Sequence, residues 1–164
     1  MSQSISDSTR TLAARGRIEN RQAIVEIGIS PLVDQAKEYG AHAPFSHFPI
    51  NTYRALIDTG AQRSCLSRST IAAEHLHWHG KKAIKNVHDQ NLHYLFWVNM
   101  GFWCERGHVS RGQESNKTYY ALDRPVEVID IAPSYWFDAI IGMDIIGQSN
   151  LTISRDGFFE MAFS

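Results

Sequence analysis

A carboxylate directly follows an apolar, strand-like run in the middle of the chain, in the sequence ALIDTG at residues 55–60. Apolar and β-branched residues favour a buried strand, whereas burial of an unpartnered carboxylate is strongly unfavourable. Gly60 permits a tight turn and the close approach of a second backbone segment. Two interpretations of Asp58 remain open from these residues alone: an ordinary turn at a strand end, where Asp and Gly are common, or a carboxylate held in place for chemistry.

A second informative segment, DAIIGMDII, lies at residues 138–146. Its apolar run at 139–141 predicts a short buried strand, and residues 143–148 predict a short helix. Asp144, near the start of that helix, is expected to interact favourably with the helix dipole rather than to take part in catalysis. Each segment is only moderately specific alone, but the two together, in this order and spacing, are informative.

Together the two segments resemble the active-site turn, and the apolar segment beneath it, of retropepsin-like aspartic proteases. The resemblance implies that Asp58 is the catalytic carboxylate, that the Thr59 hydroxyl ties two such turns together across a dimer, and that the Gly60 backbone lies close to the substrate. Ala61 belongs to the same turn and dimer contact, and it lacks the hydroxyl that two-lobed relatives often carry at this position. The hydrophobic shelf beneath the turn would consist of Ile140, Ile141 and Gly142.

The resemblance also implies the reaction, the hydrolysis of peptide bonds by an aspartic endopeptidase. Two carboxyl groups share a proton in this chemistry, because two close carboxylates cannot both ionise. One acts as base on a water and the other as acid on the peptide carbonyl. The chain has a single Asp-Thr-Gly, so the second Asp58 must come from a homodimer with a two-fold interface. We expect peptide or protein substrates, bound in extended form, and no cofactor or metal.

The pattern of apolar segments predicts an all-β fold, which the resemblance specifies as a closed, single-lobed retropepsin-like β-barrel with one or two short helices. Residues 1–21 are interpreted as a flexible N-terminal arm and residues 22–164 as the protease domain. The apolar segment at 158–163 follows the turn signal Asp156-Gly157 and is expected to be an edge strand that pairs with the partner chain. Further strands are expected at residues 22–29, 48–57, 83–87, 92–103, 119–131 and 151–153.

A hairpin between residues 83–87 and 92–103 is the candidate for the flap that covers the cleft in this family. The turn of this hairpin would be formed by His88, Asp89, Gln90 and Asn91. Family flaps usually carry glycines at the tip, whereas residues 82–98 include none. One alternative therefore stays open, a catalytically weak or inactive module that keeps the fold and serves in peptide binding or dimerisation.

Three alternating histidines offer a second alternative, a metal-binding protein. On a strand the side chains of His75, His77 and His79 would share one face, and imidazole is a good zinc ligand. The sequence does not clearly place an acidic or cysteine partner beside them. A solvated, histidine-rich turn is the preferred interpretation.

Charge and cysteine content limit the remaining classes of protein. The net charge of -1 indicates no general attraction to nucleic acid or to an anionic membrane. The longest apolar run, around residues 94–103, is too short to span a bilayer, and residues 1–20 lack the apolar core of a secretory signal. Two cysteines are too few for a disulfide framework, so we expect free thiols, a reducing compartment and a cytoplasmic protein.

Overall fold

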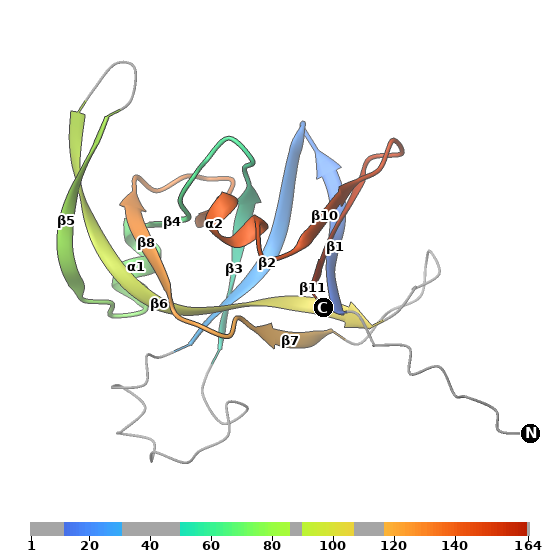
Figure 1. Ribbon diagram of the computed structural model, residues 1–164, viewed down its shortest axis with the longest axis horizontal. Helices are drawn as coiled ribbons and strands as arrows, with labels where there is room; N and C mark the ends of the chain where they lie inside the picture. Colours follow the sequence, from blue (N-terminus) through green and yellow to red (C-terminus); the bar gives the residue numbers. More distant parts are fainter. Residues whose placement is uncertain (1–11, 31–49, 86–89, 107–116, 164) are drawn as a thin grey trace, which may run out of the picture.

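The computed structural model describes residues 12–30, 50–85, 90–106 and 117–163 (Figure 1). Strands dominate these ranges, and two short helices, α1 (Arg68–Ala73) and α2 (Met143–Ile146), accompany them. No helix in these ranges is long and apolar enough to cross a membrane. The strands of the first half are β1 (Leu12–Glu19), β2 (Gln22–Ser30), β3 (Asn51–Ile57), β4 (Cys65–Ser67) and β5 (Trp78–Lys85). Those of the second half are β6 (Gln90–Arg106), β7 (Thr118–Ala121), β8 (Val126–Ile131), β9 (Ala139–Ile141), β10 (Asn150–Ile153) and β11 (Phe158–Phe163).

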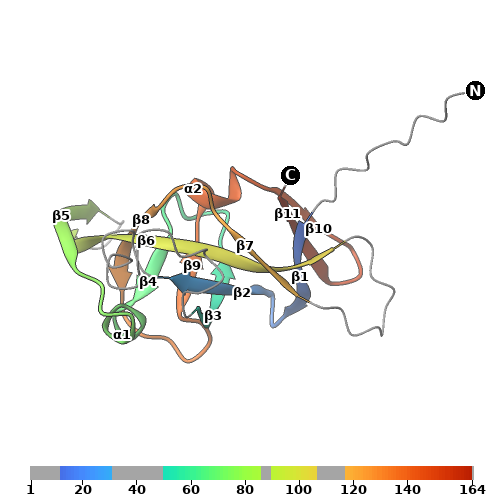
Figure 2. The ribbon, with the colours of Figure 1, turned by 90° about the horizontal axis from the view of Figure 1, so that it is seen from below.

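The strands form one sheet that closes on itself. Its order is β10-β11-β1-β2-β3-β9-β4-β8-β6-β5, and β6 pairs additionally with β2, β1 and β7. The pairings β2–β3, β3–β9, β9–β4, β4–β8, β8–β6 and β6–β2 therefore complete a ring. In both ribbon views β6 runs the length of the molecule, from β5 at one end to β1 at the other (Figures 1 and 2). This architecture confirms the expected all-β fold with two short helices.

The core forms around β6, because its side chains alternate between the two faces of the sheet. On the inner face Phe96, Val98, Met100, Phe102 and Cys104 are all buried. The same core includes Val25, Ile27, Ile29 and Ile141. The ring of strands thus encloses a continuous apolar interior.

The β2–β6 crossing depends on two glycines that face each other across the ladder, Gly28 and Gly101. The ring of Tyr119 on β7 lies over both, and its hydroxyl donates a hydrogen bond to the Gly28 carbonyl oxygen at 3.1 Å. A Cβ at Gly101 would overlap with the Tyr119 ring and with the backbone carbonyl of Tyr120. Only glycine at these positions lets the tyrosine ring seal this part of the barrel.

The prediction of a flexible N-terminal arm over residues 1–21 is wrong for residues 12–19, which form a strand. Leu12–Glu19 forms β1, which pairs with β11 from Leu12↔Phe163 to Arg17↔Phe158. An ion pair between Arg15 Nε and Glu160 Oε2 at 2.6 Å joins the two strands. The alternation of apolar and polar residues that marks a strand is absent here, because small and charged residues predominate. The strand forms because it pairs with β11. Residues 1–11 lie outside the described residues.

The edge position expected for residues 158–163 is also wrong. The strand β11 lies between β10 and β1 and is hydrogen-bonded on both sides within its own chain. The reason is β1 itself, which occupies the side of β11 that a partner chain was expected to fill. The apolar C-terminal segment is therefore an inner strand of the sheet, and a second copy cannot add a strand to either edge of β11.

The expected hairpin is confirmed, but its second strand begins two residues earlier than predicted. Strands β5 and β6 pair from Trp78↔Phe96 to Lys85↔Gln90. Gln90 and Asn91 therefore belong to β6 rather than to the turn, because Gln90 pairs with Lys85 and Asn91 with Ile84 across the ladder. The other two turn candidates, His88 and Asp89, lie outside the described residues.

We predict that Gly101→Ala lowers the free energy of unfolding by at least about 1–3 kcal/mol, since a new methyl group must displace a tyrosine ring and a backbone carbonyl. Gly80→Ala in the neighbouring strand β5 is the matched control. Its Cβ would lie 3.5 Å from Leu95 Cδ1, an ordinary contact, so its effect should stay below about 1 kcal/mol. Urea denaturation of both variants measures the difference, and equal effects would contradict the packing described for Tyr119.

Candidate active site

Asp58 is the residue directly after β3, where this strand leaves the barrel. Strands β3 and β9 run parallel, with Leu56 opposite Ile140 and Ile57 opposite Ile141. The Asp58 amide continues this ladder and donates a hydrogen bond to the Ile141 carbonyl oxygen at 3.0 Å. The two segments singled out in the sequence are therefore neighbours, and Ile141 is fully buried beside the aspartate strand.

A tight turn follows Asp58 and holds its carboxylate. The Gly60 amide donates to Asp58 Oδ1 at 2.9 Å, and the Ala61 amide donates to the Asp58 carbonyl oxygen at 3.2 Å. A Cβ at Gly60 would lie only 3.2 Å from Asp58 Oδ1, so a larger residue would crowd the carboxylate. Asp58 is half-buried, whereas Thr59 and Gly60 are exposed. The turn thus presents one oriented carboxylate at the surface.

Gly142 forms the support on which this turn lies. A Cβ on Gly142 would lie 2.7–2.9 Å from the backbone atoms of Arg63 and Ala61. The next residue, Met143, donates its amide to the Ala61 carbonyl oxygen at 2.8 Å. In Figure 1 the loop after β3 accordingly lies beside α2. The backbone of the turn and the start of α2 are therefore in direct contact, which leaves room for glycine alone.

A buried serine and the first carboxylate of α2 lock this contact. Ser64 is fully buried, and its amide and hydroxyl donate to the two Asp144 carboxylate oxygens at 3.0 and 2.7 Å. The Ser64 hydroxyl also accepts a hydrogen bond from the Gly142 amide at 2.9 Å. The sequence led us to expect only a favourable interaction of Asp144 with the helix dipole. In the structure its carboxylate also accepts two hydrogen bonds from Ser64. Sequence reasoning missed Ser64, because nothing but its place in the loop distinguishes it.

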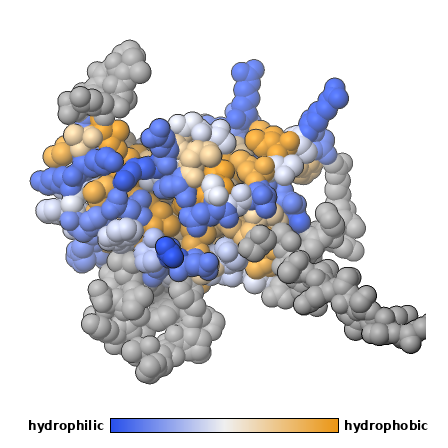
Figure 3. All heavy atoms as spheres, viewed as in Figure 1, coloured by the Kyte–Doolittle hydropathy of each residue, from blue (hydrophilic) through white to orange (hydrophobic). Residues whose placement is uncertain are grey.

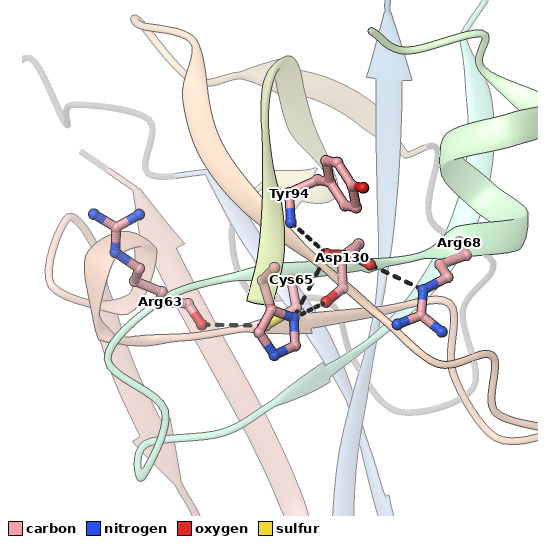
Figure 4. Close-up of polar contacts among 6 residues, drawn as sticks. Arg63, Cys65, Arg68, Tyr94 and Asp130 are labelled. Carbon is pink, nitrogen blue, oxygen red and sulfur yellow. Dashed lines mark hydrogen bonds and ion pairs between the residues drawn. The ribbon is translucent and has the colours of Figure 1, made fainter. Parts of the chain in front are cut away.

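A second network holds the base of the β5–β6 hairpin (Figure 4). Asp130 on β8, 5% exposed, accepts hydrogen bonds from Arg68 Nε at 2.9 Å and from the Tyr94 amide at 2.8 Å. Burial opposes ionisation of this carboxyl, but the two hydrogen bonds and the charges of Arg68 and His93 outweigh it and lower its pKa. Asp130 therefore ties α1, β6 and β8 together. It carried no signal in the sequence.

A groove of about 400 Å³ lies between the loop that follows Asp58, from Ala61 on, and strand β5 of the hairpin. Cys65 forms part of its wall and is almost fully buried. Burial, and then the charges of Asp144, Asp58 and Asp130, raise the pKa of the Cys65 thiol to about 12, so the thiol stays neutral. We name this hollow the Lys82 groove; its lining residues are Ala61, Gln62, Arg63, Cys65, Lys82, Ala83, Ile84 and Ile129.

The three alternating histidines, His75, His77 and His79, do not come together with other ligands as a metal site in the described part of the chain. His79 lies 3.3 Å from a Glu127 oxygen and stacks on Trp97, with ring centroids 5.4 Å apart. The other oxygen of Glu127 pairs with Arg63 at 2.8 Å. His75 stands in a left-handed turn at the end of α1, with φ of 53°. Among the described residues, no group of three potential metal-ligating side chains comes together.

The surface over the β5–β6 hairpin is partly apolar (Figure 3). Trp78, Leu92 and Trp97 are exposed there. Trp97 is on β6, one residue after the buried Phe96, so the two faces of this strand differ in their surroundings. The hairpin is thus amphipathic, with buried apolar side chains on one face and exposed ones on the other.

The fold is similar to that of a retropepsin-like aspartic protease from Rickettsia conorii, with a TM-score of 0.53 over 93% of this chain and 92% of that one, at 7% sequence identity. This likeness shows a retropepsin-like fold. A foamy viral protease-reverse transcriptase, solved with an RNA/DNA hybrid, aligns over 80% of this chain and 13% of its own at 15% identity, with a TM-score of 0.37, too low to inform the comparison. No protein-family model and no curated protein sequence matches the chain.

We predict that Asp144→Ala lowers the free energy of unfolding by about 1–2 kcal/mol, because it removes the charged acceptors of the Ser64 amide and hydroxyl. A helix-dipole role alone would account for only about 0.3–1 kcal/mol. Asp144→Asn should be milder, since it keeps one acceptor oxygen and the side-chain shape. Asp123→Ala, at an exposed position, is the control and should change stability by less than about 0.5 kcal/mol. Chemical denaturation measures all three, and an Asp144→Ala variant as stable as the control would contradict the lock.

Proposed function

We propose that this protein is an aspartic endopeptidase, in which two copies of Asp58 activate a water for the hydrolysis of peptide bonds. The observation that carries the proposal is the Asp58 turn: its carboxylate is held in one orientation by the Gly60 amide, and its backbone is held by β9 and by the residues around Gly142. The loop that follows this turn, from Ala61 on, lines a groove. The retropepsin-like fold of the chain supports the same assignment.

The chemistry follows from two carboxyl groups that share one proton. The ionised Asp58 takes a proton from the water as its oxygen attacks the carbonyl carbon, and the protonated Asp58 gives its proton to the carbonyl oxygen. The tetrahedral diol then collapses: the C–N bond breaks, and the leaving nitrogen takes the proton from the carboxyl that had accepted it from the water. One hydroxyl of the diol returns its proton to the other carboxylate as the carboxylic acid forms, so the pair again holds one proton. No metal or covalent enzyme intermediate takes part in these steps.

The second carboxyl must come from a second copy, since the sequence has one Asp-Thr-Gly. The surface around the turn supports such a contact, because Thr59 and Gly60 are exposed and Met143 beside them is 44% exposed. An exposed apolar side chain of this kind is favourable at an interface between copies. We therefore assign the dimer contact to the face that carries Thr59, Gly60 and Met143 rather than to β11.

The groove and the hairpin suit an extended peptide substrate. An extended chain can pair with exposed backbone while its alternate side chains enter pockets. The Lys82 groove lies between the Asp58 loop and β5, where one such side chain would lie.

Cys65 and Cys104 are both free and buried, which supports the reducing, cytoplasmic location expected from the sequence.

A catalytically weak or inactive peptide-binding module is the second candidate. The observation that favours it is the absence of glycine from residues 82–98, which include most of the described hairpin. The two candidates differ in cleavage, not in peptide binding. Pepstatin, a mimic of the tetrahedral intermediate, should raise the melting temperature of an active dimer. A module that binds peptides without cleaving them should respond to extended peptides but not to pepstatin.

We predict that Asp58→Asn abolishes peptide cleavage while leaving fold and dimer intact, because it removes the shared proton and keeps the side-chain shape. A peptide-library assay should show a loss of at least about 10³-fold, the scale for essential acid–base groups. Asp123→Asn, an equal change at an exposed position far from the turn in sequence, is the matched control and should cleave normally. Comparable activity of Asp58→Asn and wild type would refute the catalytic role.

The requirement for two chains predicts that activity per chain falls on dilution. Below the dissociation constant of the dimer, the specific activity should decrease in proportion to the fraction of dimer. Analytical ultracentrifugation and activity measured over the same concentrations provide the comparison. Met143→Glu, which places a charge in the assigned interface, should shift both curves to higher concentration together. A well-folded monomer that cleaves peptides with constant specific activity would contradict the dimer.

A further inference from the structure

The floor and wall of the Lys82 groove are apolar. Ile129 and Cys65 are each 7% exposed, and Ile84 is half-buried. The Cys65 thiol donates a hydrogen bond to the Arg63 carbonyl oxygen at 3.6 Å, so its polar hydrogen is satisfied within the protein. Such a floor accommodates the methylene groups of a substrate side chain and offers no hydrogen-bonding group to its polar end.

The charges at the rim of the groove are not equally compensated. Arg63 pairs with Glu127 at 2.8 Å, and Glu127 lies close to His79 as well. The nearby carboxylate of Asp130 is bonded to Arg68. Lys82 lines the groove and is exposed, and within the described ranges no carboxylate pairs with it. Lys82 therefore contributes the uncompensated charge of this hollow.

The direction of Lys82 is fixed by the alternation of β5. The preceding residue, Lys81, faces the other side of the strand, with its Nζ 5.3 Å from the Tyr94 ring and 5.5 Å from the Trp78 ring. Lys82 must point the opposite way, on the same face as its register partner His93. The two adjacent lysines thus have the same charge and different surroundings, and only Lys82 lines the groove.

From this arrangement we infer that the Lys82 groove selects an acidic side chain of the substrate, Glu or Asp. The methylene group or groups of this side chain lie on the apolar floor, and its carboxylate accepts a hydrogen bond from Lys82 Nζ. A lysine or arginine at the same substrate position is disfavoured by the charge of Lys82. The inference rests on the proposed peptidase function and specifies its substrate class.

The test is a cleavage profile on peptide libraries with randomised positions, for wild type, Lys82→Glu and Lys81→Glu. Wild type should prefer Glu over Gln at one position near the scissile bond by about fivefold in kcat/KM, the upper end for an exposed ion pair. Lys82→Glu should abolish or reverse this preference, whereas Lys81→Glu should keep it. Melting temperatures confirm that both variants fold, and higher salt should weaken the preference.

A binding measurement separates failure of the inference from failure of the proposed function. Labelled peptides in which one Glu, Gln or Lys is moved along an apolar sequence are titrated into Asp58→Asn, with and without Lys82→Glu. If wild type cleaves no peptide, the peptidase assignment is wrong, and the binding preference for Glu still supports or overturns the inference. Three results would overturn the inference of an acidic specificity. They are cleavage or binding without a preference for an acidic residue, a preference that survives Lys82→Glu, and the absence of any peptide binding.

Discussion

The site depends on the backbone contact between the Asp58 turn and Gly142. The parallel ladder between β3 and β9 extends to Asp58, whose amide donates to the Ile141 carbonyl oxygen. Gly142, directly after β9, lies so close to the loop after Asp58 that a Cβ on it would be 2.7 Å from the backbone of Arg63. Because amide and carbonyl groups make this contact, the turn cannot shift without breaking the parallel β3–β9 ladder. The position of the carboxylate is thus a property of the barrel rather than of a mobile loop.

Two side-chain networks extend this rigidity to the surroundings of the site. Ser64 and Asp144 join the loop after the turn to α2, and Asp130 joins the hairpin base to α1 and β8. Both networks use a carboxylate that accepts a hydrogen bond from at least one backbone amide. Preorganised supports of this kind hold a surface carboxylate in one orientation. The Lys82 groove then has one wall on the loop after Asp58 and one wall on the hairpin.

Local sequence patterns predicted the parts of the fold that depend on local chemistry. The run ending in Asp58 and the apolar segment at 139–141 were recognisable because apolar strands, an acid and a glycine stand in a fixed order. Strand β1 was not recognisable, since its buried positions are alanines and its stability comes from pairing with β11. Ser64 and Asp130 were missed for a related reason: their partners lie 80 and 36–62 residues away along the chain. Because β1 was missed, the free edge of β11 that it covers was predicted to pair with a second chain. That prediction was wrong as well.

The central claim is that one active site uses Asp58 from two chains, and mixing wild type with Asp58→Asn tests it most directly. Equal amounts of the two proteins, allowed to exchange subunits, should form mixed dimers with one aspartate each. If both carboxyls are needed, activity should fall with the square of the wild-type fraction, to about one quarter in an equal mixture. A fall that is linear with the wild-type fraction, to about one half, would show that each chain carries a complete site and would contradict the account.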